Sequence, residues 1–531
     1  MEKMSDSVIE IVDLFYKPRS VAVIGASKVP MKGGNRIVKN LYRNGFKGQI
    51  YPINPNYNEE DELCGFKFKR SVLDIEDEVD LAIFYVNNRI VTTILKDCVK
   101  KGVKAAIIQS AGFEEVGVEG LKLRDKIAAI TDNFSKLRIV GPNCMGISRF
   151  DGDYKGKEGG FFTGQFTLTN YKRGNVAIIT QSGFLNGGIA PLIFQQYPNL
   201  GFRYIVSIGN KMDLGENEFL EYILKDDTVN VIAIYLESFK EPRKFISLCR
   251  EAKKLPKKTI ILVKGGKTSQ GMKAASSHTG ALAEDERLID AIIKQAGVIQ
   301  ANNFFEMFQF LRTFSMMYKS GKKFPRKGNI ALVVGSGGMG TVMGDVAMKY
   351  GLKFPEFGEK SYNTLKSIFP DWMPPNRFAL VDSWPTMEKA MSEAAKKAKN
   401  TSKNSNNNGK ADGSERDLFR MMGSSGNVMQ VIQRAVLEEP KIEGLFTSMP
   451  GGPRGREGTL DFMKQMLEGI AKYPKPIFFY SVMESEGTLE MLRMYGQYNI
   501  PVFSRTEDAA KNFAMLVQET KNKEKFLKTL K

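Results

Sequence analysis

The chain has 531 residues, a formal net charge of +18, 42% hydrophobic residues and a single histidine. This length exceeds what one hydrophobic core supports, so the sequence predicts several domains. Cys64, Cys98, Cys144 and Cys249 are far apart, and with one histidine they cannot supply metal-ligand spacing, so we expect reduced, mostly buried thiols and no metal site. No apolar run approaches the roughly 20 residues that cross a membrane, and we expect a cytoplasmic protein without membrane contact.

The positive charge is spread along the chain and is not gathered into a tail. It suits an anionic ligand such as a nucleotide, although an ordinary lysine-rich surface explains most of it. Nucleic-acid-binding proteins typically combine clustered basic motifs with interleaved aromatic residues, and this sequence lacks that combination. We therefore do not expect a nucleic-acid partner.

Short apolar runs that end in a small or turn-forming residue alternate with amphipathic helical stretches over residues 10–150. The segment RIVTTILKDCVKKG (89–102) is typical of such a helix. The alternation predicts βαβ units in a parallel, Rossmann-like sheet, with ligands at the carboxyl ends of the strands. The expected strands lie in SVAVIGAS (20–27), QIYPINPN (49–56), DLAIFYVN (80–87), AAIIQSAG (105–112) and RIVGPNCMG (138–146).

Two further series of the same kind follow, at residues 151–320 and 325–520. Each predicts a flavodoxin-like domain with a parallel sheet, so the expected fold is α/β with three such domains in tandem. The expected strands of the second series lie in NVAIITQSG, RYIVSIGN, VNVIAIYLES and TIILVKGG. Those of the third lie in NIALVVGSGGMG, KIEGLFTSMPGG, KPIFFYSVMES and IPVFSRT.

Residues 396–417, KKAKNTSKNSNNNGKADGSERD, interrupt the third series. The segment is rich in Asn, Ser and Lys and shows no apolar periodicity. Such a segment cannot bury enough apolar surface to become ordered. The sequence therefore predicts a flexible insertion within the third domain.

Two glycine loops fit a dinucleotide-binding turn. Gly25 follows the strand SVAVI, and GSGGMG (335–340) follows IALVV. Such turns present backbone N–H groups to a pyrophosphate at a helix N-terminus. A nicotinamide dinucleotide also requires an acidic residue at the end of the next strand. The first series has Asn54 and Pro55 there, and the third offers only Glu356, so the sequence disfavours NAD(P).

The first glycine loop suits coenzyme A better. GASKVPMKGGN (25–35) supplies glycines, Ser27, Lys28 and Lys32 as donors to phosphate groups, without requiring a free ribose hydroxyl. Coenzyme A carries a phosphate on its 3′ position and needs such cations and N–H donors. A tight strand-to-helix turn without a ligand is the alternative.

Two segments of the second series place small polar residues ahead of expected helices. In TQSGFLNGG, Ser182 and Gly183 stand at the start of one helix. In SSHTGALAEDERLIDAIIKQAG, Ser277 or Thr279 is a candidate cap of another. Because a helix N-terminus carries about half a positive charge, the two helices are suited to bind one phosphate between them.

His278 is expected on the loop that enters the second of these helices, among small residues that expose its side chain. Glu237 ends the strand of AIYLES. A glutamate that accepts a hydrogen bond from one ring nitrogen fixes the tautomer and makes the other nitrogen a better nucleophile. An enzyme that carries a phosphoryl group on histidine needs this arrangement, whereas a packed histidine without chemistry is the alternative.

With these residues in place, the chain resembles the α-subunit portion of the NDP-forming acyl-CoA synthetases. This superfamily includes succinyl-CoA synthetase and ADP-forming acetyl-CoA synthetase. The resemblance covers roughly residues 10–520. The matching strings occur in the family's order: VAVIGAS, YPINPN, IIQSAGF, IVGPNCMGI, ITQSGFLNGGI, SIGNKMDL, YLESF, SSHTGALA and VVGSGGMG.

The resemblance implies a CoA-binding domain (10–150), a ligase domain that carries the phosphorylated histidine (151–320) and a third flavodoxin-like domain (325–520). In such enzymes, acyl-CoA and phosphate give acyl phosphate and free CoA. The histidine then takes the phosphoryl group, which releases the carboxylic acid. Its loop moves to a nucleotide site, where ADP becomes ATP.

The resemblance also implies roles for individual residues. His278 would be the phosphoryl carrier and Glu237 its supporting carboxylate. Phosphate would be bound by Ser182, Gly183, Thr279 and Gly280. Coenzyme A would be bound by Gly25, Ala26, Ser27, Lys28, Asn54, Pro55, Gln109, Ser110 and Ala111.

Two positions depart from the family's pattern. Relatives often follow Asn-Pro with a lysine that is suited to contact phosphate, whereas this chain has Asn56. Family members commonly have NPxDL in the third domain, whereas here NRFALVDSW inserts residues between Asn376 and Asp382. These departures indicate a specialised branch with altered CoA binding.

The nucleotide-binding ATP-grasp domains of this family add on the order of 200 residues, the size of one or two ordinary domains. Since the three series already account for this chain, the resemblance implies a separate ATP-grasp β-subunit that binds ADP or ATP with Mg, in a hetero-oligomer. The expected ligands of the pair are a CoA thioester and a carboxylic acid. The alternatives are a non-catalytic CoA-binding regulatory subunit, an NAD(P)-dependent oxidoreductase and an acyl-CoA–carboxylate exchanger that uses no nucleotide.

Overall fold

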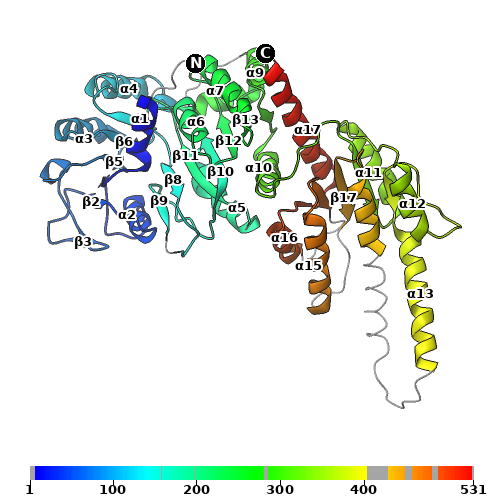
Figure 1. Ribbon diagram of the computed structural model, residues 1–531. Coiled ribbons are helices and arrows are strands. Elements are labelled where there is room, and N and C mark those ends of the chain that lie inside the picture. Colours follow the sequence, from blue (N-terminus) through cyan, green and yellow to red (C-terminus); the bar gives the residue numbers. More distant parts are fainter. Residues whose placement is uncertain are drawn as a thin grey trace. The chain divides into compact units, whose positions relative to one another are not determined.

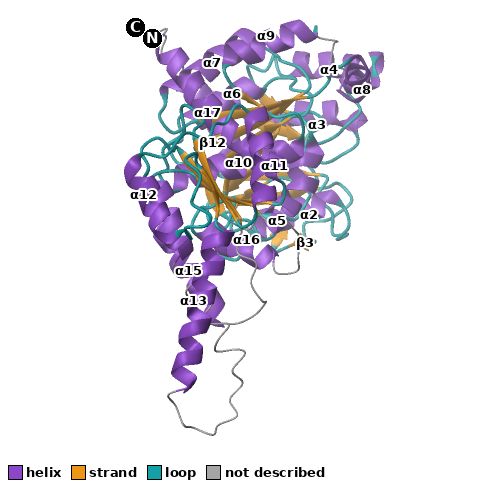
Figure 2. Cartoon of the chain, turned by 90° about the vertical axis from the view of Figure 1, so that its right-hand side faces the viewer, coloured by secondary structure: helices purple, strands orange, loops and turns teal. Residues whose placement is uncertain are grey.

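The protein forms two compact units, residues 1–315 with 525–531 and residues 316–524. The first unit contains two large sheets and a small hairpin, and the second contains one sheet (Figure 1). Helices flank the strands of each sheet (Figure 2), which confirms the expected α/β class. The computed structural model describes residues 6–156, 158–197, 199–279, 285–403, 428–448, 457–480 and 488–528.

The first sheet has five parallel strands in the order β2-β1-β5-β6-β7. Its three central strands are buried along their whole length, as is typical of a parallel sheet covered on both faces. Each strand arises from a run that the sequence predicted as a strand. The strands are β1 (Ser20–Ile24), β2 (Gln49–Ile53), β5 (Leu81–Phe84), β6 (Ala105–Ile108) and β7 (Arg138–Val140).

Helix α3 shows how the sequence sets the local structure around this sheet. The Asn87 side chain caps its N-terminus, and Gly102 ends it in the left-handed region at φ 86°. Val91, Leu95 and Cys98 bury one face of the helix. The helices are α1 (Asp6–Tyr16), α2 (Gly33–Arg43), α3 (Asn88–Lys101) and α4 (Val118–Ile130). Shorter elements are β3 (Glu62–Leu63), β4 (Phe66–Lys67) and the 3₁₀ turns Val72–Asp74 and Glu114–Val116.

The second sheet has seven strands in the order β14-β13-β12-β10-β11-β8-β9. The parallel strands are β10 (Arg173–Thr180), β11 (Phe202–Ser207), β12 (Val231–Leu236), β13 (Thr259–Lys264) and β14 (Ile299–Gln300). The edge strands β8 (Ile147–Phe150) and β9 (Gly160–Phe162) are antiparallel. The sequence predicted only parallel strands here, because strands as short as β8 and β9 carry too few residues to show a periodicity.

The helices that flank this sheet show that one prediction was wrong. Thr279 belongs to α8 together with Ser277 and His278, so neither Ser277 nor Thr279 caps the next helix. Helix α9 begins after Asp285, whose side chain accepts a hydrogen bond of 2.7 Å from the Arg287 N–H. Aspartate is an equally good cap, and the alanines before His278 favour continuation of the preceding helix. The helices are α5 (Ala190–Gln196), α6 (Glu216–Leu224), α7 (Pro242–Lys254), α8 (Ser269–Thr279), α9 (Glu286–Ala296) and α10 (Phe304–Lys319).

The third sheet has five parallel strands in the order β16-β15-β17-β18-β19, which is the flavodoxin-like order. The sequence predicted these strands except β16. They are β15 (Ile330–Val334), β16 (Leu380–Asp382), β17 (Gly444–Ser448), β18 (Ile477–Tyr480) and β19 (Val502–Phe503). The helices are α11 (Gly337–Lys349), α12 (Glu359–Ile368), α13 (Trp384–Lys403), α15 (Glu457–Ala471), α16 (Thr488–Gln497) and α17 (Thr506–Lys528), with a further helical segment at 428–438.

Helix α13 extends into the stretch 396–417 that the sequence predicted to be a flexible insertion. Residues 396–403 are helical, contrary to that prediction. Lysine and alanine are good helix formers, so a helix that has already started continues through them without an apolar face. The rest of the predicted insertion lies outside the described residues.

Two kinds of feature are not found within the described ranges. None of the described helices is long and apolar enough to cross a membrane. Over the same residues, no group of three His, Cys, Asp or Glu side chains is placed to hold a metal ion.

One ion pair joins the two sheets of the first unit. Asp213, in the loop after β11, accepts hydrogen bonds of 2.8 and 2.7 Å from the Arg138 guanidinium. It accepts a third, of 2.8 Å, from the backbone N–H of Ile139 in β7. Because the buried carboxylate is satisfied by three donors, it fixes the loop after β11 against the end of the first sheet.

We expect Asp213→Ala to destabilise the first unit by about 3–5 kcal/mol, because the half-buried Arg138 guanidinium loses its counterion. Hydrogen exchange with mass spectrometry over a urea series, read on peptides from β7 and β10, measures this change. Glu119→Ala is the control, since Glu119 pairs with Lys122 on the exposed surface of the same unit. Equal protection in the two variants would contradict a role of Asp213 in joining the sheets.

Candidate active site

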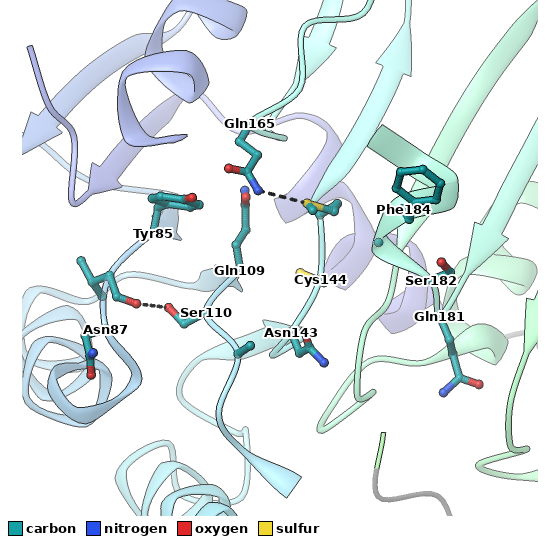
Figure 3. A pocket seen from close by; sticks show the side chains of 14 residues that line it. Tyr85, Asn87, Gln109, Ser110, Asn143, Cys144, Gln165, Gln181, Ser182 and Phe184 are labelled. Carbon is teal, nitrogen blue, oxygen red and sulfur yellow. Dashed lines mark hydrogen bonds between the residues drawn. The ribbon is translucent and has the colours of Figure 1, made fainter. Parts of the chain in front are cut away.

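A cavity of about 640 Å³ lies in the first unit where the carboxyl ends of strands from its two sheets meet. In Figure 3, residues from the first sheet line one side, and the segment from Gln181 to Phe184 lines the other. Ligands of parallel α/β sheets bind at this edge. All lining residues are uncharged: Tyr85, Val86, Asn87, Gln109, Ser110, Ala111, Asn143, Cys144, Met145, Gln165, Gln181, Ser182, Gly183 and Phe184.

Three predicted CoA-binding residues, Gln109, Ser110 and Ala111, line the cavity after β6. The Ser110 hydroxyl donates to the Val86 carbonyl at 2.5 Å, which fixes its position (Figure 3). Gln109 Nε2 donates to the Thr163 carbonyl at 2.7 Å, whereas its Oε1 is buried without a hydrogen-bond partner. A buried polar atom of this kind needs a partner, so Gln109 offers an acceptor to an N–H or O–H group of a ligand.

The predicted phosphate-binding residues Ser182 and Gly183 lie on the opposite wall. A helical segment begins at Gly183, as the sequence predicted, and it includes the π-helical turn Leu185–Ile189. The N–H groups of a first helical turn have no partner within the helix, and this end carries about half a positive charge. A Cβ atom on Gly183 would lie 2.7 Å from Cγ of Met145, so glycine lets the helix start close to the cavity wall. The wall is therefore suited to bind an anion.

The loop 141–146 connects the two walls. Asn143 adopts the left-handed region at φ 56°, which asparagine tolerates better than most residues. Its backbone N–H donates to the Ser110 carbonyl at 2.9 Å. The Met145 N–H donates to the Ser207 hydroxyl at 3.0 Å, at the end of β11. The loop thus holds the ends of β6 and β11 in a fixed relation across the cavity.

The predicted CoA-binding residues at the ends of β1 and β2 lie beside the cavity and do not line it. Gly25 has φ 85°, and a Cβ atom there would lie 2.3 Å from the carbonyl oxygen of Tyr85, which does line the cavity. Asn54 Nδ2 donates to the Ala26 carbonyl at 2.7 Å and ties the two strand ends together. Pro55 follows and is exposed. These residues form an edge that leads to the cavity.

Ser27 and Lys28 on this edge are both engaged by the protein. The Ser27 hydroxyl lies 3.3 Å from that of Tyr57, and Lys28 Nζ donates to Asp61 at 2.8 Å. The hydrogen bond with Asp61 raises the pKa of Lys28 and keeps it charged. A phosphate group at Lys28 therefore has to compete with Asp61. Asn56 donates its backbone N–H to Asn54 Oδ1 at 3.0 Å.

Glu237 lies directly after β12 and is 8% exposed. Its Oε1 accepts a hydrogen bond of 3.0 Å from the Tyr235 hydroxyl, whereas its Oε2 is buried and has no hydrogen-bond partner. Burial, followed by the charge of Glu237, raises the pKa of Tyr235 far above its ordinary value, so the phenol stays a donor. One oxygen of the carboxylate is therefore available for a further donor.

Gln181 connects Glu237 to the cavity. Its Oε1 accepts hydrogen bonds of 2.6 and 3.1 Å from the backbone N–H groups of Glu237 and Ser238. From the other side, Nζ of the buried Lys264 donates to the Glu237 carbonyl at 2.7 Å. Because Gln181 also lines the cavity, a ligand there lies one residue away from the backbone that carries Glu237.

His278 lies near the C-terminal end of α8, and Thr279 ends that helix. Helix α8 runs beside the 3₁₀ turn Glu114–Val116 of the first sheet. The side chains of His278 and Thr279, and all of Gly280, lie outside the described part of the chain. The contact between His278 and Glu237 stays a prediction.

Several residues of the site were not predicted. Gln181 and Asn143 lie within strand-end strings that the sequence analysis singled out, so their position was the available signal. Tyr85 follows β5 in the same way. Gln165 lies in a loop without any pattern, and only the folded chain brings it to the cavity, where its Nε2 donates to Met145 Sδ at 3.5 Å (Figure 3).

Comparisons with known proteins identify the family of this chain. Residues 19–149 match the family model of the CoA binding domain, and residues 173–314 match that of the succinyl-CoA ligase like flavodoxin domain. The chain is 36% identical over 362 residues to acetate–CoA ligase [ADP-forming] II subunit alpha of Pyrococcus furiosus, which covers 68% of this chain and 74% of that protein. The chain belongs to the NDP-forming acyl-CoA synthetase family. This confirms the resemblance found in the sequence.

Further relatives within the family differ in length. The chain is 37% identical over 383 residues to acetate–CoA ligase [ADP-forming] II of Archaeoglobus fulgidus, covering 72% of this chain and 53% of that protein. It spans about half the length of this and two other curated relatives. The solved structure of Ca. Korarchaeum cryptofilum dinucleotide forming acetyl-coenzyme A synthetase 1 in complex with phosphate and ADP has a TM-score of 0.77 and 25% identity. The match covers 98% of this chain and 99% of that chain.

Cys144 lines the cavity, but burial disfavours its thiolate form. Burial raises the pKa of its thiol to about 12, as it does for Cys98. The Cys144 Sγ donates to the Ile108 carbonyl at 3.3 Å. The thiolate is the reactive form of cysteine, so a thiol with this pKa reacts slowly.

We expect an alkylating reagent to modify Cys64 first, because it is the only one of the four cysteines that is not buried. Burial also raises the pKa of Cys64, so the thiolate fraction and the rate should increase as pH rises toward that pKa. Peptide mass spectrometry after iodoacetamide treatment at several pH values measures both effects. Cys98 and Cys249 are the buried controls, and modification of Cys144 as fast as Cys64 would show that the cavity holds a reactive thiol.

Proposed function

We propose that this chain is the α-subunit of an ADP-forming acyl-CoA synthetase. Together with a partner it would interconvert acyl-CoA, ADP and phosphate with a carboxylic acid, CoA and ATP. The observation that carries this proposal is that one cavity brings predicted CoA-binding residues, Gln109 to Ala111, opposite the predicted phosphate-binding residues Ser182 and Gly183. A thioester and a phosphate bound to these walls would meet inside it.

In the first step, phosphate would be bound at the helix start of Gly183, where unpaired N–H groups and the helix dipole stabilise its charge. The CoA thioester would lie along the edge formed by Gly25, Ala26 and Asn54, with its acyl group in the cavity. A phosphate oxygen attacks the thioester carbon, the carbon–sulfur bond breaks, and acyl phosphate and the CoA thiolate result.

In the second step, an imidazole nitrogen of His278 would attack the phosphorus of acyl phosphate. The bond from phosphorus to the carboxylate oxygen breaks, and the carboxylic acid leaves as its anion. Glu237 Oε2, which lacks a partner, is suited to accept the N–H of the other ring nitrogen. The positive charge that develops on the ring would then be stabilised by a buried carboxylate.

The nucleotide step would take place on a separate ATP-grasp β-subunit that binds ADP or ATP with Mg. One observation supports this part of the proposal: the relative in Pyrococcus furiosus is named subunit alpha. The domain bounds that belong to this proposal are 10–150, 151–320 and 325–520.

The structure gives no support to an NAD(P)-dependent oxidoreductase. Asn54, which stands where a ribose-binding acidic residue is needed, uses Nδ2 to bind the Ala26 carbonyl and Oδ1 to bind the Asn56 N–H. Among the described residues, none of those that line the cavity is a charged proton-transfer group. These observations favour acyl transfer over hydride transfer.

We expect the wild-type chain to acquire label from radioactive phosphate in the presence of an acyl-CoA, and His278→Ala to acquire none. Phosphohistidine is labile to acid and stable to base, so the stability of the label identifies the bond. Gel autoradiography after each treatment measures it, with the ATP-grasp partner added where the chain alone is unlabelled. Base-stable label on His278→Ala, or none on the wild type with the partner present, would contradict the proposal.

We expect Glu237→Gln to slow formation of the label by about 100-fold or more, because the neutral amide no longer stabilises the positive ring. Tyr235→Phe is the matched variant, since it removes a hydrogen bond from the same carboxylate but keeps its charge, and we expect a loss below about tenfold. Rapid-quench labelling measures both rates, and thermal melting confirms that both variants fold. Wild-type rates in Glu237→Gln would remove Glu237 from the mechanism.

A further inference from the structure

A second hollow of the first unit is lined mainly by charged residues, unlike the active-site cavity. It is a groove of about 610 Å³ that shares no residue with that cavity. Figure 1 shows α7, α9 and the C-terminal end of α17, which enclose it, beside one another. The groove is lined by five cations and one carboxylate: Arg243, Arg250, Lys254, Lys294 and Lys525 with Glu251, together with Ile246, Ser247, Gln295 and Phe526.

Helix α7 carries three of these cations on one face. Arg243, Arg250 and Lys254 are spaced by seven and four residues, which places them along a single stripe of an α-helix. At 1.5 Å per residue, the stripe from Arg243 to Lys254 is about 16 Å long. The positive charge of the groove is therefore extended and is not concentrated at one point.

The end of α17, from Lys525 onward, packs against α7 and α9 and contributes to the lining of the groove. A Cβ atom on Gly297, which ends α9, would lie 2.3 Å from the ring of Phe526. The Arg250 guanidinium lies over the same ring at 5.7 Å, and Arg250 Nε donates to the Gln295 carbonyl at 3.2 Å. This packing fixes the position of Arg250. It also places Lys525, the neighbour of Phe526, in the lining of the groove.

The groove has more positive than negative side chains. Lys254 pairs with Glu251 at 2.6 Å, but within the described ranges no carboxylate pairs with Arg243, Lys294 or Lys525.

In another basic cleft of the same unit, the arginines pair with carboxylates. Arg19 pairs with Asp80 at 2.8 Å, and Arg149 pairs with Asp151 at 2.7 Å. Like charges that face one groove without counterions repel one another, so an acidic ligand would be attracted there.

We propose that this groove binds an extended acidic segment of a partner protein. At about 3.3 Å per residue, a strand of roughly five residues spans the stripe of α7, with its carboxylates between Arg243 and Lys254. A compact oligophosphate would reach only part of the stripe. The proposal rests on this groove alone and is independent of the proposed enzymatic function.

The test uses a fluorescein-labelled hexaglutamate peptide, with hexaglutamine as the uncharged reference, and follows binding by fluorescence anisotropy. The groove variant is Arg243→Glu, Lys294→Glu and Lys525→Glu combined. The matched control is Lys104→Glu, Lys126→Glu and Lys172→Glu combined, which changes the net charge equally at exposed positions of the same unit. All six side chains are exposed, so both variants are expected to fold.

We expect hexaglutamate to bind the wild type, the groove variant to weaken this binding by about tenfold or more, and the control to weaken it by less than about twofold. Equal losses in both variants would show general attraction to a chain of net charge +18 and would overturn the proposal. No binding of hexaglutamate would overturn it as well. Displacement of the peptide by tripolyphosphate at a lower concentration than by unlabelled hexaglutamate would identify a phosphate site instead.

Discussion

The covering of parallel sheets by helices on both faces is the constraint on which this molecule depends. Because both faces are covered, the strands are buried hydrophobic runs, and polar residues can enter only where the strands end. In the first unit, two such sheets bring these ends together around one cavity, joined by the loop 141–146 and the pair Arg138–Asp213. Most of the described residues that line this cavity lie on a loop or turn that follows a strand.

This constraint explains how much of the fold was predictable. Buried parallel strands leave a strong local pattern, so all strands of the first sheet were found from the sequence. The short antiparallel strands β8 and β9 depend on pairing with distant residues and leave no such pattern. The prediction that Ser277 or Thr279 caps the next helix was wrong for a related reason, since both Thr279 and Asp285 are good helix caps and the choice between them depends on where α8 stops.

The same distinction applies to the candidate site. The resemblance singled out Gln109 to Ala111, and the pattern of small polar residues ahead of a helix singled out Ser182 and Gly183; the structure places these residues in the lining of one cavity. The hydrogen bond from the backbone N–H of Glu237 to Gln181 was not predictable, because it joins residues that follow different strands. A single sequence specifies which residues reach the edge of a sheet. Only the packed structure specifies which of them form hydrogen bonds with one another.

The active-site cavity and the groove differ in charge, and the proposed roles of the two sites explain this difference. Although the chain has a net charge of +18, none of the described residues that line the active-site cavity is charged, whereas five cations line the groove. In the proposed reaction, phosphate has to be bound and then passed on. A lysine or arginine in a desolvated cavity would bind phosphate and acyl phosphate with similar strength and would slow their release. The start of a helix carries only about half a charge and fixed N–H dipoles, which stabilise a charge as it develops without binding the ground state as tightly. The uncharged wall at Ser182 and Gly183 is thus suited to bind phosphate and then release it. Full cations are suited to the groove, where the proposed acidic segment would stay bound.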